Sequence, residues 1–124
     1  MEPLIIAQTN ETPAVTLNGN EGTFKFVGKS YPENVNEFYG NILNYLELYL
    51  KNPKDKTILE FNWVYFNTAS AKIIVKIIVL LKVLKMQGKT FEIKWFCKPS
   101  DDLMQEKGEE LKELLDVEFT IIHV

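Results

Sequence analysis

The strongest constraint on the fold is the alternation of two hydrophobic periods from residue 34 onward. Segments whose apolar residues recur every three or four positions alternate with segments whose apolar residues recur at every second position. Helices are expected at 34–51, at 68–87 and after 100, and strands at 57–66, 90–97 and 118–123. Because a helix between two strands lets them lie parallel through a right-handed crossover, this order predicts a largely parallel sheet.

The two clearest strands also indicate how the sheet is covered. Glu60 and Asn62 in one strand, and Glu92 and Lys94 in the other, alternate with apolar residues. A strand covered by helices on both faces is apolar nearly throughout, so these polar faces are expected to be partly solvated. Three short β-prone runs precede the first helix, at 4–6, 14–17 and 23–27. The chain is therefore predicted to be an α/β protein with a mixed, mainly parallel sheet and helices packed on one face.

Capping residues mark the ends of the expected helices. Asn34 is a good N-cap for the first helix, and Ser30 with Glu33 forms a competing capping box. Ser100 is expected to cap the third helix, and Gly88 to close the second.

Composition argues against several classes of protein. The 124 residues, 46% of them hydrophobic, are expected to form one domain over 1–124. With 14 basic against 17 acidic residues, the chain lacks the basic patch of a nucleic-acid-binding protein. Its one cysteine allows no internal disulfide, its N-terminus lacks the features of a signal peptide, and lysines interrupt its longest apolar stretch. We therefore expect a cytoplasmic protein that binds neither nucleic acid nor a membrane.

Side chains for catalysis or metal binding are scarce. The sole histidine, His123, lies next to the C-terminus, and Cys97 alternates with Trp95 in an expected strand. A zinc site needs three or four ligands, and a nucleophilic triad needs a histidine in a pocket. We predict no catalytic residue, no cofactor and no metal site. The competing hypothesis is a small enzyme that relies on acidic residues, although most of the clustered acids fall on a solvated face of the third helix.

The most informative segment joins the strand 57–66 to the helix that follows it. It places the hydroxyl groups of Thr68 and Ser70 at the carboxyl end of a strand and in the first turn of a helix. Open α/β sheets bind ligands at that edge, and the positive end of the helix dipole stabilises a phosphate. A phosphate on either hydroxyl would therefore be stabilised at this position. The alternative is that Thr68 serves only as the N-cap of the helix.

The helix that follows has more apolar residues than one face of a sheet requires. Surplus apolar residues fall among its lysines; the apolar ones are Val75, Ile78, Val79 and Val83, and the lysines are Lys72, Lys76, Lys82 and Lys85. Such exposed apolar area indicates a surface for a partner protein. The alternative is that neighbouring helices cover it.

Three motifs carry a resemblance to a known family: T-P-A at 12–14, S-Y-P-E-N at 30–34, and Y-F-N-T-A-S at 65–70. With them the chain resembles, over nearly its whole length, the SiaC family of bacterial regulatory phosphoproteins. The resemblance implies a fold similar to that of STAS-domain anti-anti-sigma factors. Ala69 departs from the serine expected at that position, which leaves Thr68 in place.

The resemblance implies that Thr68 is the phosphoacceptor of a partner-switching protein that is not an enzyme. It also implies three partners: a histidine-kinase-like serine/threonine kinase, a PP2C-type phosphatase and a diguanylate cyclase. The unphosphorylated protein would bind and activate the cyclase, raising cyclic di-GMP and favouring biofilm formation. The alternative is a constitutive STAS-like binding module with a different target, in which Thr68 is only a helix cap.

The partner surface is expected to surround Thr68 at one edge of the sheet. Residues that open the first helix are expected to lie near Thr68, with turn and cap roles as their alternative. The residues predicted to bind partners are Tyr31, Pro32, Glu33, Asn34, Tyr65, Asn67, Ser70, Lys72, Val75, Lys76 and Val79. A phosphate beside this surface would weaken binding through its charge and the cost of desolvating it.

Overall fold

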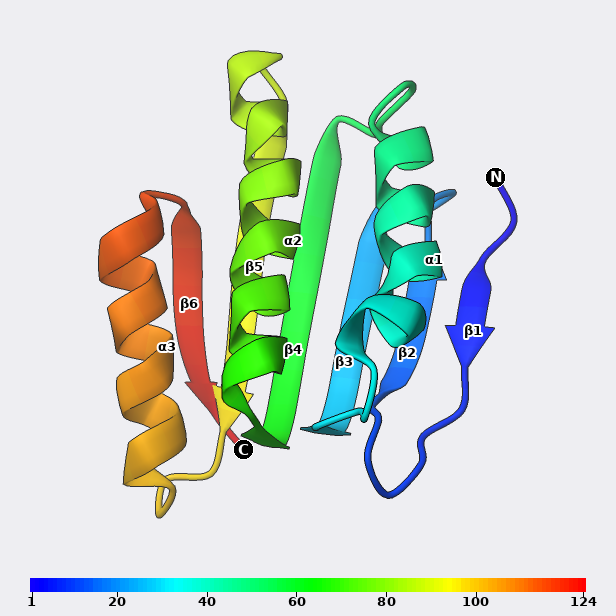
Figure 1. Ribbon diagram of the computed structural model, residues 1–124. Coiled ribbons are helices and arrows are strands. Elements are labelled where there is room, and N and C mark those ends of the chain that lie inside the picture. Colours follow the sequence, from blue (N-terminus) through cyan, green and yellow to red (C-terminus); the bar gives the residue numbers. More distant parts are fainter.

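The computed structural model describes all 124 residues as one six-stranded sheet with three helices. The strands are β1 (Leu4–Ile6), β2 (Ala14–Asn18), β3 (Thr23–Ser30), β4 (Lys56–Phe66), β5 (Thr90–Cys97) and β6 (Glu118–His123). The helices are α1 (Val35–Tyr49), α2 (Thr68–Met86) and α3 (Asp102–Leu115). The strands lie in the sheet in their chain order, from β1 to β6 (Figure 1).

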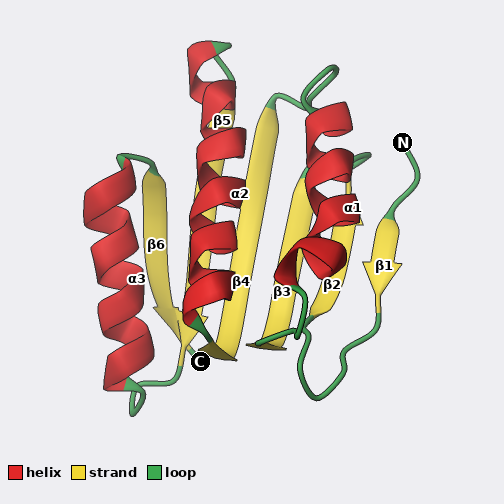
Figure 2. Cartoon of the chain, viewed as in Figure 1, coloured by secondary structure: helices red, strands yellow, loops and turns green.

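The strand order explains why all three helices lie on one face. The pairs β1–β2 and β2–β3 are antiparallel, whereas β3–β4, β4–β5 and β5–β6 are parallel. Each parallel connection passes through one helix and steps in the same direction across the sheet, so right-handed crossovers place every helix on the same side. Figure 2 shows the three helices side by side in front of the sheet. The predicted mixed, mainly parallel sheet with helices on one face is confirmed.

The hydrophobic core lies between the helices and the covered face of the sheet. Apolar side chains of β2 to β6 alternate into it and meet one stripe of each helix. On the uncovered face, Glu60, Asn62, Glu92 and Lys94 remain partly exposed, and Lys56 pairs with Glu92 at 3.5 Å. The partial solvation predicted for this face is therefore confirmed.

The helix N-caps agree with the prediction in one case and differ in another. Asn34 caps α1, since its side chain accepts a hydrogen bond from the backbone N–H of Glu37 at 3.1 Å. The prediction that Ser100 caps α3 is wrong. Asp101 caps this helix instead and accepts from the N–H of Met104 at 3.1 Å, which brings a negative charge to the positive end of the helix dipole.

Helix α2 is central and has neighbours on both sides, α1 and α3 (Figure 1). Ile78, predicted to belong to an exposed apolar surface, is fully buried in the core. Val79 does point outward and is 53% exposed. The C-cap of the helix is Gln87, one residue earlier than the predicted Gly88. Gly88 follows it in a left-handed conformation with φ of 74°. None of the helices combines the length and apolar character needed to cross a bilayer.

Candidate functional site

The site forms where the carboxyl ends of β3 and β4 meet the beginnings of α1 and α2. The backbone N–H of Asn67 donates to the carbonyl of Ser30 at 3.1 Å, which holds the two strand ends together. The rings of Tyr31 and Tyr65 then meet edge to face, with centroids 5.9 Å apart. The structure therefore brings together the two segments that the sequence placed at this edge.

A register shift in the sheet determines which way β4 presents its last residues. The pairing of β3 with β4 slips between Gly28 and Lys29, so that Lys29 lies opposite Tyr65. Beyond this irregularity Tyr65 is exposed and Phe66 is buried. Strict alternation along β4 would place Tyr65 on the same buried face as Trp63, but the bulge shifts the phase by one residue at this point.

The residue that caps α2 is Asn67 and not Thr68. The Asn67 side-chain oxygen accepts from the backbone N–H of Ser70 at 2.9 Å, while its backbone is extended as an N-cap requires. Thr68 is the first residue of the helix, and its side chain is exposed. The interpretation of Thr68 as the helix cap is therefore wrong, because the asparagine before it fills that role.

Ser70 lies in the core, away from the surface for which it was predicted. The Ser30 hydroxyl donates to the Ser70 hydroxyl oxygen at 2.8 Å, and Ser30 Oγ lies 2.6 Å from the Tyr39 hydroxyl. Since Ser30 has only one hydroxyl proton, Tyr39 must be the donor of the second bond. All three side chains are fully buried, and burial raises the pKa of Tyr39 to about 12. Ser70 therefore ties α2 to β3 and α1, and its side chain cannot contact a partner.

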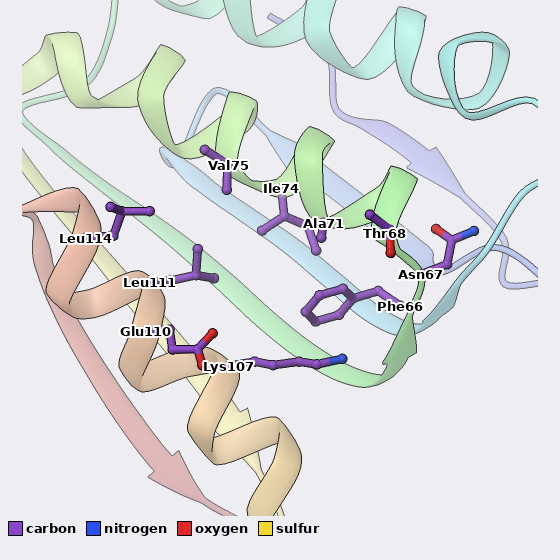
Figure 3. A pocket seen from close by; sticks show the side chains of 10 residues that line it. All are labelled: Phe66, Asn67, Thr68, Ala71, Ile74, Val75, Lys107, Glu110, Leu111 and Leu114. Atoms are coloured by element: carbon purple, nitrogen blue, oxygen red, sulfur yellow. The ribbon is translucent and has the colours of Figure 1, made fainter.

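Thr68 stands at one end of an open groove between α2 and α3 (Figure 3). The groove has a volume of about 310 Å³, and six of its ten lining residues are hydrophobic. From α2 and the end of β4 come Phe66, Asn67, Thr68, Ala71, Ile74 and Val75, and from α3 come Lys107, Glu110, Leu111 and Leu114. An exposed hydroxyl beside an apolar groove is suited to modification and to control of what enters that groove.

The α3 side of this groove was missed by the sequence analysis. Lys107 places its ammonium group over the ring of Phe66, 4.5 Å from the ring centroid. Leu114, about two turns further along α3, is 72% exposed. Nothing in the local sequence indicates that α3 faces Thr68. The available signal was the presence of Leu111 and Leu114 among the acidic residues of this helix.

The other residues predicted to bind partners fall into two groups around Thr68. Pro32, Glu33 and Asn34 surround the start of α1, where Glu33 and Asn34 are exposed beside a shallow hollow. On α2, Val75 lines the groove, while Lys72, Lys76 and Val79 lie on the exposed outer face of the helix. Thr68 lies where the groove and the outer face of α2 meet.

Comparison with known proteins gives a consistent result over almost the full length. The family model that describes SiaC family regulatory phosphoproteins matches residues 6–124. An uncharacterised protein of Pseudomonas aeruginosa strain UCBPP-PA14 is 29% identical over 121 residues, covering 98% of this chain and 96% of that protein.

Solved structures from Pseudomonas aeruginosa agree in fold. The crystal structure of apo-SiaC superposes with a TM-score of 0.91 at 29% identity, covering 98% of this chain and 99% of that one. SiaC in complex with the diguanylate cyclase SiaD, of which it is the activator, superposes with a TM-score of 0.92 at 28% identity and the same coverage. The protein described here belongs to the SiaC family of regulatory phosphoproteins.

Proposed function

We propose that this protein is a non-enzymatic, cytoplasmic partner switch, a single STAS-like domain that is controlled by phosphorylation of Thr68. In its unphosphorylated form it binds and activates a diguanylate cyclase. A histidine-kinase-like serine/threonine kinase adds the phosphate, which releases the cyclase, and a PP2C-type phosphatase removes it.

The observation that carries this proposal is the contrast between the two hydroxyls in the first turn of α2. The Ser70 hydroxyl is fully buried and hydrogen-bonded to Ser30, so a kinase cannot reach it. The Thr68 side chain is exposed, lies at the mouth of the groove and is not needed as a cap. Only Thr68 therefore offers a kinase an accessible acceptor here.

Phosphorylation at this position changes both charge and shape where the two predicted partner surfaces meet. A phosphate brings roughly −1.5 to −2 charges at pH 7 to the rim of a largely apolar groove. A partner that buries this rim would have to desolvate that charge, which disfavours the complex. Coupling of about 1–3 kcal/mol corresponds to a 5–150-fold change in affinity, enough for a switch.

The choice of a diguanylate cyclase as partner is supported by the relative that was solved in complex with the cyclase SiaD. The match to that relative covers 98% of this chain at 28% identity. The outer face of α2, with Lys72, Lys76 and Val79, supplies exposed cationic and apolar groups for such a contact on the helix that begins at Thr68.

Partner capture from lysate of the native host tests the proposal, with wild type, Thr68→Ala and Thr68→Asp as baits and phosphosite mapping of the endogenous protein. We expect phosphate on Thr68, retention of a cyclase by Thr68→Ala, and at least about tenfold weaker capture by Thr68→Asp. Thr120→Asp is the matched control. Thr120 is exposed on the uncovered face of the sheet and lies opposite Lys94, so a carboxylate is tolerated there.

The alternative of a constitutive module predicts a different pattern. All baits would then capture the same proteins, and Thr68 would carry no phosphate under any growth condition. That combined result would exclude the switch.

A further inference from the structure

One cation lines the groove that begins at Thr68. Lys107 extends from α3 toward Phe66, and its ammonium end points toward the Asn67–Thr68 end of the groove (Figure 3). The only other ionisable side chain of the groove, Glu110, is one turn further along α3. The charge that could receive an anion at the Thr68 end therefore comes from the neighbouring helix.

The ammonium group of Lys107 has no anionic partner in this structure. The two ion pairs of the chain join Lys56 to Glu92 and Lys89 to Asp55. The Lys107 Nζ instead rests 4.5 Å from the centroid of the Phe66 ring. A cation–π contact with phenylalanine is weaker than a charge-assisted hydrogen bond to a phosphate, so a phosphate within reach would displace it.

The direction of the helices brings Lys107 level with the first turn of α2. Both α2 and α3 follow parallel strands, so both begin at the same edge of the sheet and run the same way. Phe66 lies two residues before Thr68 and already contacts the lysine. A lysine side chain has four rotatable bonds, which allows its ammonium to move from the ring toward the threonine.

We propose that Lys107 binds the phosphate carried by Thr68, forming an ion pair that bridges α2 and α3 across the mouth of the groove. This inference rests on the proposed function, since it takes Thr68 as the acceptor. It adds a specific consequence to that function. The phosphorylated form differs from the unphosphorylated form in having its groove closed by Lys107, in addition to carrying a new charge.

Lys72 is the competing cation, because it lies four residues after Thr68 on the same helix. Its side chain is exposed and does not line the groove. Water and salt screen an exposed pair more than one in a partly closed groove, and Lys107 is half-buried.

The test uses purified full-length protein with phosphothreonine incorporated genetically at position 68, so that it does not depend on any kinase. Phosphorus NMR titration gives the second pKa of the phosphate in wild type, Lys107→Gln, Lys72→Gln and Lys107→Arg. Lys112→Gln is the matched control, since it removes the same charge from an exposed position of α3 outside the groove. Hydrogen exchange of the α3 amides is measured on the same samples, with and without the phosphate.

We expect Lys107→Gln to raise the phosphate pKa by about half a unit, because the variant removes a partly screened cation that stabilises the dianion. Lys72→Gln and Lys112→Gln should shift it less, and Lys107→Arg should restore the wild-type value. Phosphorylation should slow exchange in the first half of α3 in wild type but not in Lys107→Gln.

Two results would overturn the inference: a larger pKa shift in Lys72→Gln than in Lys107→Gln, or α3 exchange that does not respond to the phosphate. Unphosphorylated Lys107→Gln, measured in parallel, separates these effects from simple loss of the Phe66 contact. If the ion pair is not found, the partner-capture experiment can still support the switch at Thr68. If partner capture fails, the ion pair can still be measured in the phosphorylated protein.

Discussion

The two flanks of the first turn of α2 are built in opposite ways. On the side of α1, the buried hydroxyls of Ser30, Tyr39 and Ser70 form a hydrogen-bonded chain that joins a strand and two helices. On the side of α3, the same turn borders an open groove in which Thr68 is exposed and Lys107 lacks an anionic partner. One flank is closed by satisfied polar groups, whereas the other presents its groups to solvent and ligands.

This difference assigns separate roles to two residues that stand two positions apart. Ser70 fixes where α2 begins relative to the sheet, and Thr68 is free to be modified without disturbing that position. Regulatory elements are drawn from the less stable parts of a fold, whereas their anchors belong to the core. The contrast can be tested by breaking each flank in turn.

The largest effect is expected from breaking the closed flank with Ser30→Ala. The substitution leaves the Tyr39 hydroxyl without an acceptor and the Ser70 oxygen without a donor, both in the core. Two buried polar groups without partners should lower the free energy of unfolding by about 3 kcal/mol, measured by urea denaturation. Ser100→Ala is the control. Ser100 is exposed and caps no helix, so its loss should cost less than about 0.5 kcal/mol.

Tyr39→Phe provides an intermediate test of the same flank. It removes the donor at the end of the chain and leaves one unpaired acceptor, so its cost should fall between the two serine variants. Equal stability of Ser30→Ala and Ser100→Ala would mean that the closed flank does not anchor α2.

Gly108→Val tests the open flank by disturbing the packing of α3 against the sheet. A Cβ at Gly108 would lie 2.7 Å from the Trp95 ring, which is fully buried and donates its Nε1–H to the Met104 carbonyl at 3.1 Å. The rigid indole cannot yield, so α3 must move away from the sheet. We expect a loss of about 2 kcal/mol from overpacking, together with faster hydrogen exchange in α3.

Gly40→Ala on α1 is the matched control for this variant. A Cβ at Gly40 meets nothing within 4 Å, and alanine is the better helix former, so stability should rise by about 0.5–1 kcal/mol. If Gly108→Val left α3 exchange unchanged, the α3 side of the groove would not depend on this close packing.

The elements of this fold were accessible from sequence because each depends on a local pattern. Strands β5 and β6 have the predicted bounds, since apolar alternation and flanking turns mark both ends. Some errors arise where tertiary contacts decide. The register shift between β3 and β4 turned Tyr65 outward. Ile78 was misplaced for a different reason, because it falls on the buried stripe of α2 at helical spacing from Ile74 and Leu81.

The candidate site was predictable only in part for the same reason. The strand-to-helix junction and its exposed threonine are continuous in sequence, so the motif identified them. Lys107 lies far from Thr68 along the chain and lines the same groove only because α2 and α3 run in parallel from one sheet edge. The burial of Ser70 likewise depends on Ser30 and Tyr39, which no local pattern connects to it.

The smallest effect distinguishes the two residues at the turn itself. Asn67→Ala removes the side chain that accepts from the Ser70 N–H, so it should lower the free energy of unfolding by about 1 kcal/mol. Thr68→Ala should change it by less than about 0.5 kcal/mol, because Thr68 is exposed and caps nothing. Asn67→Ser, which keeps a capping oxygen, should recover most of the loss. If Thr68→Ala lowered the free energy of unfolding more than Asn67→Ala, Thr68 would be the helix cap. That result would argue against a hydroxyl that is available for modification.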